Sequence, residues 1–269
     1  MAEFCWAAQT DLPGIRTLWQ TAFGDSSDYI DEFFQICFTE NRVLILREQG
    51  QLTSMATVFR ASVGGELVWY LYAVATDPIF RGAGFATALM EQAALLAEQE
   101  TAAGIVLLPA SASLQAFYGA RGYRPWGMRT EQMFLKSAAQ PVCRVHPVSA
   151  ADYGALRAQR LQELAYLDFE PVFLQLQAET AVQSGGFLAA LELEGVCGCA
   201  VIYKDAGKLL VPELLIAPQL RAKAAAALLA QFGAVQCRAA WPGAGCAYGM
   251  LRPLRNVLPE QGYLGLALD

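Results

Sequence analysis

The chain has 269 residues, of which 55% are hydrophobic and 16% are charged. This apolar composition excludes an intrinsically disordered protein, and the length suffices for one large domain or two modest ones. Asp and Glu number 25 against 19 Lys and Arg, giving a formal net charge of -6. A nucleic-acid-binding protein needs a clustered basic face, so the charge disfavours that class. With His146 as the single histidine, a zinc site built from several histidines is also excluded.

The cysteine pattern and the apolar runs indicate the compartment. Seven cysteines occur at irregular spacing without a CxxC pair, which favours free, mostly buried thiols in a reducing compartment. A redox or metal role for Cys197 and Cys199 is the alternative. The N-terminal segment lacks the features of a signal peptide, and the longest uncharged run, residues 101–120, is interrupted by Pro109 and polar residues. We therefore expect a cytoplasmic protein with no membrane partner and no metal.

The first predicted elements are helices and a strand pair. Asp11 is of a type that caps helices, and an apolar helical pattern follows it. Residues 17–41 contain no Lys or Arg but five carboxylates. On helices these charges form either a solvated face or a site for a cationic ligand. Residues 43–59 then alternate as two strands joined at the turn Gln49-Gly50.

A strand, a glycine-bearing loop and a helix come next. Residues 69–76 are rich in aromatic and branched side chains, as in a central strand, and the loop Arg-Gly-Ala-Gly-Phe-Ala-Thr at residues 81–87 leads into an Ala- and Leu-rich helix. Glycines let the backbone approach a diphosphate closely, and a helix N-terminus favours an anion. A second buried strand at residues 104–109 and a short helix at 114–123 complete the unit.

The second half of the chain repeats the first about 140 residues later. The matched pairs are residues 11–16 with 152–157, 43–59 with 187–203, and 78–86 with 218–226. These offsets indicate a tandem duplication of one α/β unit, with chance alignment of apolar segments as the alternative.

We predict two domains, residues 1–138 and residues 139–269. In the second, Ala222 and Ala224 replace the two loop glycines, and their methyl groups would block a diphosphate. We therefore expect the second domain to be a degenerate, structural copy that lacks the diphosphate-binding loop of the first.

At these residues the chain resembles the GCN5-related N-acetyltransferase (GNAT) superfamily. Residues 81–86 fit the family's Q/R-x-x-G-x-G/A loop, which cradles the pyrophosphate of acetyl-CoA, and residues 117–123 fit its FYxxxGF/Y element. A narrower likeness, in residues 18–34 and 108–111, is to the tandem-GNAT group around Eis, the enhanced-intracellular-survival acetyltransferases. The resemblance covers residues 1–135 well and residues 142–269 weakly.

The resemblance implies a fold and a set of cofactor contacts. The fold is α/β, with two tandem GNAT units whose mixed, mainly antiparallel sheets are flanked by helices, the second unit being degenerate. The implied acetyl-CoA contacts are Val74, Ala75 and Thr76 with the pantetheine and thioester, Arg81, Gly82, Ala83, Gly84, Phe85, Ala86 and Thr87 with the diphosphate, and Ser111, where many members have Asn.

The implied activity is that of an acetyl-CoA-dependent N-acetyltransferase of the EC 2.3.1 class. A primary amine attacks the thioester directly, a strand N–H near Thr76 binds the oxyanion, and Tyr118 protonates the leaving thiolate. The general base is open between Glu66, a carboxylate of residues 25–32, a water chain and the terminal carboxylate of Asp269. The acceptor is expected to be a small cationic amine. Its candidate contacts are Phe23, Asp25, Asp28, Glu32 and Phe34.

Three other functions stay open. One is a catalytically silent acyl-CoA-binding or regulatory protein, which the intact Tyr118 and loop glycines disfavour. Another is a Fem-type aminoacyltransferase, whose tRNA donor needs a basic groove that this acidic chain does not offer. The last is a protein N-terminal acetylase. A homo-oligomer is compatible with all of them.

Overall fold

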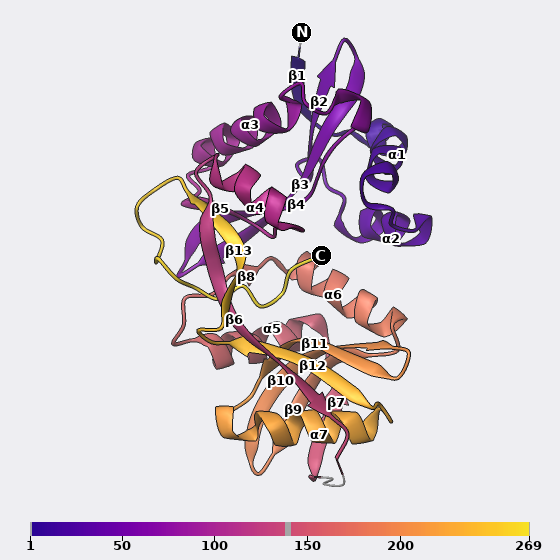
Figure 1. The fold of residues 1–269 in the computed structure, drawn as a ribbon, viewed down its shortest axis with the longest axis vertical. Coiled ribbons are helices and arrows are strands. Elements are labelled where there is room, and N and C mark those ends of the chain that lie inside the picture. The colour runs from indigo at the N-terminus through magenta and orange to yellow at the C-terminus, as the bar shows by residue number, and fades with distance from the viewer. Residues whose placement is uncertain (1, 138–140, 269) are drawn as a thin grey trace. The chain divides into compact units, whose positions relative to one another are not determined.

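The computed structural model describes residues 2–137 and 141–268, and the chain divides into two compact units (Figure 1). The first unit comprises residues 2–124, 250–258 and Leu268, and the second comprises residues 125–249 and 259–267. The predicted boundary between residues 138 and 139 lies outside the described residues. The division is not a single cut, because the segment after residue 124 belongs to the second unit while residues 250–258 return to the first.

The first unit is built on a mixed sheet. Its strands are β1 (Ala2–Trp6), β2 (Val43–Glu48), β3 (Gln51–Val63), β4 (Glu66–Thr76), β5 (Gly104–Leu107) and the end of β13 (Cys246–Pro253), adjacent in that order. Strands β4 and β5 are parallel, and the remaining neighbours pair antiparallel. A parallel pair needs a crossover connection, and a helix provides it here.

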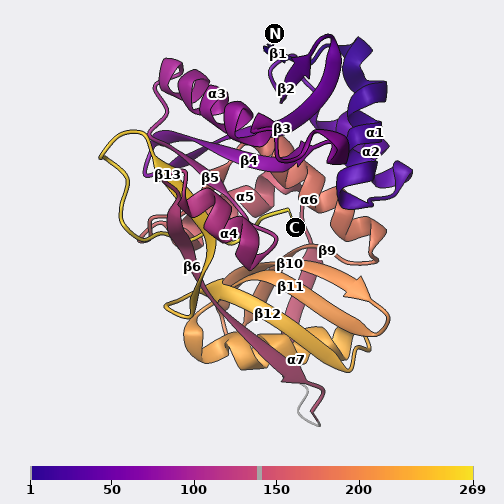
Figure 2. The ribbon, with the colours of Figure 1, turned by 45° about the horizontal axis from the view of Figure 1, so that its top comes forward.

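Helices cover both faces of this sheet. On one face lie α1 (Leu12–Phe23) and α2 (Ser27–Cys37), and on the other lies α3 (Phe85–Gln99), as Figure 1 and Figure 2 show. The short α4 (Ala112–Gly119) follows β5, and the single turns η1 (Gln9–Asp11) and η2 (Pro78–Phe80) precede α1 and α3.

The pleat of β4 distributes its side chains between the two helical layers. Trp69 and Leu71 belong to the apolar core that α3 covers, together with Leu89 and Ala93. The intervening Tyr72 lies on the other face, where its ring centroid is 5.5 Å from that of Trp19 in α1. Successive strand residues point to opposite faces, so an uninterrupted apolar run is what a strand buried on both sides requires.

Both predicted hairpins are confirmed. Strands β2 and β3 meet at Gln49 and Gly50, whose φ angles are 52° and 79°. Strands β9 (Phe187–Leu193) and β10 (Val196–Asp205) meet at Glu194 and Gly195, with φ of 53° and 75°. Two successive positive φ angles define the type I′ turn that matches the twist of a two-residue hairpin.

The second unit repeats this arrangement. Its strands are β7 (Cys143–Pro147), β9, β10, β11 (Lys208–Leu215), β12 (Gln236–Pro242) and β6 (Arg124–Leu135), adjacent in that order. Its helices are α5 (Ala150–Leu161), α6 (Pro171–Gln183) and α7 (Arg221–Gln231), which follows the turn η3 (Pro218–Leu220); a two-residue strand, β8 (Asp168–Phe169), precedes α6. Helices α5 and α6 pack on β9 and β10, and α7 lies on the opposite face (Figure 2).

The two units therefore share one topology. In each, two helices separate the first strand from a hairpin, and a third helix connects a parallel strand pair, β4 with β5 and β11 with β12. This correspondence extends the repeat seen in the sequence to every strand pairing, which chance similarity of apolar segments does not produce.

The helix caps differ from expectation in one respect. Asp11 precedes α1 as predicted, but its carboxylate accepts a hydrogen bond from the Ala8 N–H and pairs with Arg47. In the second unit the cap is Ser149, whose hydroxyl accepts from the Asp152 N–H; Asp152 is the third residue of α5. The helix therefore begins where the repeat predicts, but the cap is Ser149, three residues before Asp152.

A buried ionic cluster joins the helical layer of the second unit to its sheet. Arg157 and Glu213 are 1% and 0% exposed, and the Arg157 Nε donates to Glu213 at 2.8 Å. The Tyr153 hydroxyl donates to the same carboxylate at 2.6 Å, and another Arg157 nitrogen donates to the Leu167 carbonyl. Buried charges are tolerated when they are paired in this way.

Candidate active site

The site begins where β4 and β5 separate. Their parallel pairing ends with Leu71 opposite Leu107. Just beyond, β4 contains one extra residue against β3, and Ala73 has a φ of 49°. A bulge with a non-glycine residue in the left-handed region bends the strand and is costly, so it persists only where the surrounding structure enforces it. The β5-facing backbone groups of β4 after Leu71 therefore have no strand partner in β5.

The glycine loop lies at the end of the separated strand. Gly82 and Gly84 have φ of 82° and 87°, and a Cβ built on either meets no heavy atom within 4 Å. The glycines are thus required by backbone conformation and leave open space in front of the loop. Gly84 caps α3, no side chain caps its first N–H groups, and the Arg81 Nε donates to the Thr76 carbonyl. Unpaired N–H groups at a helix N-terminus form an anion site.

A hollow of about 640 Å³ connects the loop to the strand gap. Of the predicted cofactor-binding residues, all but Ala83 line it: Val74, Ala75, Thr76, Arg81, Gly82, Gly84, Phe85, Ala86, Thr87 and Ser111. The Ser111 hydroxyl caps α4 by accepting from the Leu114 N–H, and it lies 2.9 Å from the Ser113 hydroxyl. The volume falls within the range of ligand sites, roughly 300–1,000 Å³.

Arg121 is a lining residue that the sequence reasoning missed. Its guanidinium lies 3.5 Å from the centroid of the Phe117 ring, donates to the Thr87 hydroxyl and donates to the Phe117 carbonyl at 2.6 Å. Arg121 thus adds a second positive charge, beside Arg81, to the wall of the hollow. Arg121 is the fifth residue of the FYxxxGY element, so the motif contains it. Only the fold shows that its side chain faces the hollow.

Tyr118 borders two hollows. It lines the 640 Å³ hollow and a second one of about 230 Å³. Its side chain is 6% exposed, and burial raises its pKa to about 12, with Arg121 opposing the shift. The phenol therefore stays protonated at neutral pH and can donate a hydrogen bond. Tyr123 is buried beside it, with 5.6 Å between the ring centroids.

The 230 Å³ hollow lies on the α1 and α2 side of the strand gap, and the predicted acceptor residues divide around it. Phe23 and Asp25 line it. Phe34 instead packs in the aromatic cluster with Trp19, while Asp28 is exposed and, like Glu32, does not line either hollow. The structure thus brings two of the five predicted acceptor residues to the site.

Of Glu66 and Asp269, the two individually named candidates for the general base, the structure describes only Glu66. Glu66 begins β4 and pairs with Arg255 at 2.5 Å. It stands ten residues before Thr76, a span of about 33 Å along a strand, so it lies far from the end of β4 where the resemblance implies the thioester. Asp269 lies outside the described residues. Leu268, before it, lines the 230 Å³ hollow, and its N–H donates to the Tyr70 hydroxyl at 3.2 Å.

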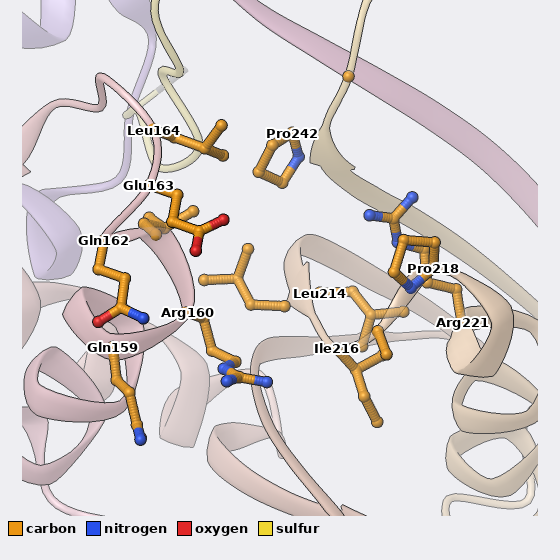
Figure 3. Close-up of a pocket in the computed structure, with 14 residues that line it drawn as sticks. Gln159, Arg160, Gln162, Glu163, Leu164, Leu214, Ile216, Pro218, Arg221 and Pro242 are labelled. Atoms are coloured by element: carbon orange, nitrogen blue, oxygen red, sulfur yellow. The ribbon is translucent and has the colours of Figure 1, made fainter.

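The second unit has a hollow of about 500 Å³ at the corresponding place, lined by Arg160, Leu214 and Arg221 among others (Figure 3). Its loop is absent. Helix α3 begins four residues after Arg81, whereas α7 begins at Arg221 itself, the counterpart of Arg81 in the repeat. Ala222 and Ala224 lie in the first helical turn, so no backbone cradle precedes the helix.

Other chemistry-bearing groups lie elsewhere. His146 is exposed on β7. All seven cysteines are free, and three are buried, Cys37, Cys199 and Cys237, so fewer thiols are buried than expected. Within residues 2–137 and 141–268, no group of three or more His, Cys, Asp or Glu side chains could hold a metal ion. In the same segments, no helix is both long and apolar enough to cross a membrane.

Comparisons with known proteins identify a matching domain family and solved structures with a similar fold. Residues 6–126 match a family model described as an acetyltransferase (GNAT) domain. A GCN5-related N-acetyltransferase from Kribbella flavida aligns over 94% of this chain and 71% of its own, with 18% identity and a TM-score of 0.71. One from Anabaena variabilis aligns over 97% and 69%, with 15% identity and a TM-score of 0.68.

Eis1 from Mycobacterium abscessus aligns over 94% of this chain and 66% of its own, with 11% identity and a TM-score of 0.63. No curated protein sequence matches. At these identities the solved structures establish the fold, whereas the family model establishes the domain. Residues 6–126 of this chain therefore match the acetyltransferase (GNAT) domain model, and nearly the whole chain shares its α/β fold with solved GCN5-related N-acetyltransferases and with Eis1.

Proposed function

We propose that this protein is an acetyl-CoA-dependent N-acetyltransferase that acts on a small primary amine. The observation that carries the proposal is the gap between β4 and β5, which adjoins a glycine cradle on one side and a hollow containing Asp25 on the other. Tyr118 borders both hollows, so a donor held in one and an acceptor held in the other would meet beside its phenol.

The residues present suit acetyl-CoA. The N–H groups of residues 84–87, together with Arg81 and Arg121, complement a diphosphate, and the open space in front of Gly82 and Gly84 admits it. The β5-facing edge of Val74, Ala75 and Thr76 can pair with the amide groups of pantetheine as a further strand would. Acetyl-CoA supplies an acetyl group on a good thiolate leaving group.

The reaction then needs three contributions. The neutral amine attacks the thioester carbonyl, forming the C–N bond, and a strand N–H near Thr76 stabilises the oxyanion. The C–S bond breaks, and the Tyr118 phenol donates a hydrogen bond to the departing sulfur. The pKa of the Tyr118 phenol, about 12, is higher than that of a thiol, so full transfer of the phenol proton to the sulfur is unfavourable. The thiolate is instead neutralised by the proton that the amine nitrogen loses when the amide forms.

The test is calorimetric titration of acetyl-CoA into the full chain, followed by assay of free CoA thiol with a panel of amines. We expect one binding event per chain and amine-dependent thiol release. Two events would contradict an inactive second unit. Binding without turnover of any amine would favour the silent acyl-CoA-binding protein, and no binding would refute the transferase.

A further inference from the structure

The hollow of about 500 Å³ in the second unit lies where two of its strands separate. The parallel pairing of β11 with β12 ends with Val211 opposite Ala239, much as that of β4 with β5 ends in the first unit. Beyond this point, residues 214–217 line the hollow from one strand and residues 242–243 line it from the other. The β12-facing backbone groups of β11 after Val211 therefore have no strand partner in β12, and an amide that enters the hollow can pair with this free edge.

Arg221 brings a guanidinium with a buried, unpaired nitrogen to this hollow. Its Nε is shielded from solvent and has no hydrogen-bond partner among the described residues. The guanidinium carbon lies 4.8 Å from the centroid of the Trp241 ring, a contact that orients the group. Burial lowers the pKa of Arg221, so the charged form loses solvation that nothing in its surroundings fully replaces. Because buried donors are almost always paired in proteins, this nitrogen calls for an acceptor from outside the chain.

The rest of the hollow combines an apolar floor with a polar rim. Residues 214–216 form the floor and are buried, whereas Arg160 and Glu163 on the rim are exposed. Figure 3 shows the Glu163 carboxylate across the hollow from the Arg221 guanidinium. One nitrogen of Arg160 donates to the Cys197 carbonyl at 3.2 Å. An occupant therefore meets two guanidinium groups and one carboxylate around an apolar surface.

We propose that the second unit binds the carboxylate of an acylated amino acid with an apolar side chain, either free or as the C-terminal residue of a peptide. A guanidinium binds a carboxylate through two parallel hydrogen bonds, which satisfies the unpaired nitrogen of Arg221. The amide beside the carboxylate pairs with the free edge of β11, and the apolar side chain covers the floor. A diphosphate does not suit this place, because α7 begins at Arg221 itself and no glycine cradle precedes it.

The experiment is calorimetric titration of three matched ligands into the full chain: N-acetyl-L-leucine, N-acetyl-L-leucinamide and 4-methylpentanoate. All three keep the branched side chain, but the second lacks the charge and the third lacks the amide. We expect N-acetyl-L-leucine to bind and the leucinamide to bind roughly 10- to 150-fold more weakly, as for loss of a hydrogen bond to a charged group. The 4-methylpentanoate should bind about 2- to 10-fold more weakly, as for loss of a neutral hydrogen bond. No binding of N-acetyl-L-leucine, or equal affinity for either analogue, would overturn the inference.

Arg221→Gln tests the position of the site and should raise the Kd of N-acetyl-L-leucine by roughly 10- to 150-fold. Lys223→Gln is the matched control, because it removes a positive charge from the same first turn of α7 at an exposed residue that does not line the hollow. It should leave this Kd unchanged. Both variants should keep the wild-type affinity for acetyl-CoA, since the glycine loop belongs to the first unit. Equal Kd values for wild type and Arg221→Gln, or equal losses in the two variants, would refute the site.

A further variant keeps the test valid even if Arg221→Gln fails to fold. Arg160 is exposed, so Arg160→Glu leaves the core intact while it places a like charge beside the carboxylate. It should raise the Kd of N-acetyl-L-leucine by about threefold or more, and an unchanged Kd would count against the site.

The two sources of the ligand are distinguished by the acetylated tripeptide Ala-Ala-Leu. Tighter binding than that of N-acetyl-L-leucine identifies a peptide C-terminus, because further backbone amides then pair with the strand edge. Weaker or equal binding identifies the free acylated amino acid. None of these titrations depends on acetyl transfer, so a failure of the proposed transferase would leave their outcome unchanged.

Discussion

The proposed role of Gly84 in binding the diphosphate of acetyl-CoA can be tested separately from its role in allowing a positive φ angle. Replacing it with Ala places a residue with a Cβ at φ 87°, and the left-handed region costs a non-glycine residue roughly 1–2 kcal/mol. The new Cβ meets no heavy atom within 4 Å, so no packing penalty is added. For a domain of this size, that cost lowers the melting temperature by about 2–4 °C per kcal/mol.

The effect on ligand binding should be larger. The methyl group would stand in the open space in front of the helix N-terminus and displace a diphosphate from its N–H groups. Loss of one hydrogen bond to a charged group, about 1.5–3 kcal/mol, corresponds to roughly 10- to 150-fold weaker binding of acetyl-CoA. Gly84→Trp should abolish calorimetric binding while the protein still unfolds cooperatively.

Gly50 provides the matched control. It lies in the β2–β3 turn of the same unit, has a φ of 79°, and its added Cβ also meets nothing within 4 Å. Gly50→Ala should therefore lower the melting temperature as much as Gly84→Ala but leave the affinity for acetyl-CoA unchanged. Equal affinities for the two variants would refute the cradle, and a loss of affinity in Gly50→Ala would show that backbone strain alone explains the effect.

Three further predictions follow from the same structure. Tyr118→Phe removes a hydrogen bond to the developing thiolate and should lower kcat by roughly 10- to 150-fold while the KM for acetyl-CoA stays unchanged, measured by thiol release; an unchanged kcat would exclude the phenol from the reaction. Arg157→Met leaves the Glu213 carboxylate buried without its partner and should destabilise the protein by about 3–5 kcal/mol in urea unfolding, whereas a loss below 1 kcal/mol would contradict the buried pair. The hydrogen bond from Arg252 is the largest cause that lowers the pKa of Glu91, so its stabilising contribution is complete above the usual glutamate pKa of about 4.3 and is lost as pH falls through the lower folded value. The difference in urea midpoint between wild type and Glu91→Gln should accordingly shrink between pH 7 and pH 3, and a constant difference would refute the assignment.

Much of the cofactor side could be predicted because its determinants are local in sequence. Positive φ at Gly82 and Gly84 depends on the absence of a Cβ, and the strand, loop and helix are consecutive. The role of Arg121 could not be predicted, because the direction of its side chain depends on contacts with Thr87, 34 residues earlier, and with the Phe117 ring. A motif gives the identity of such a residue but not the direction of its side chain.

The acceptor side was predicted less completely for a related reason. The resemblance assigns the acceptor contacts to the first two helices and the segment between them, but it does not say which of their side chains reach the strand gap. The structure turns Phe34 into an aromatic cluster and leaves Asp28 in solvent. Asp25 is selected by a hydrogen bond to Trp19, a contact between side chains that no pattern of residue types specifies.

The amino-acid sequence by itself determined the features that depend on short-range chemistry. These are the hairpin turns, the strand–loop–helix with its glycine conformations, the FYxxxGY element, and the duplication of the underlying α/β unit. Tertiary structure alone decided where β4 leaves β5, which strands each unit contains, and which carboxylate stands in the small hollow. Those features arise from pairings between residues far apart in the chain, such as Leu71 with Leu107 and Met250 with Leu107, whose register is set by packing on both faces of the sheet rather than by neighbouring residues.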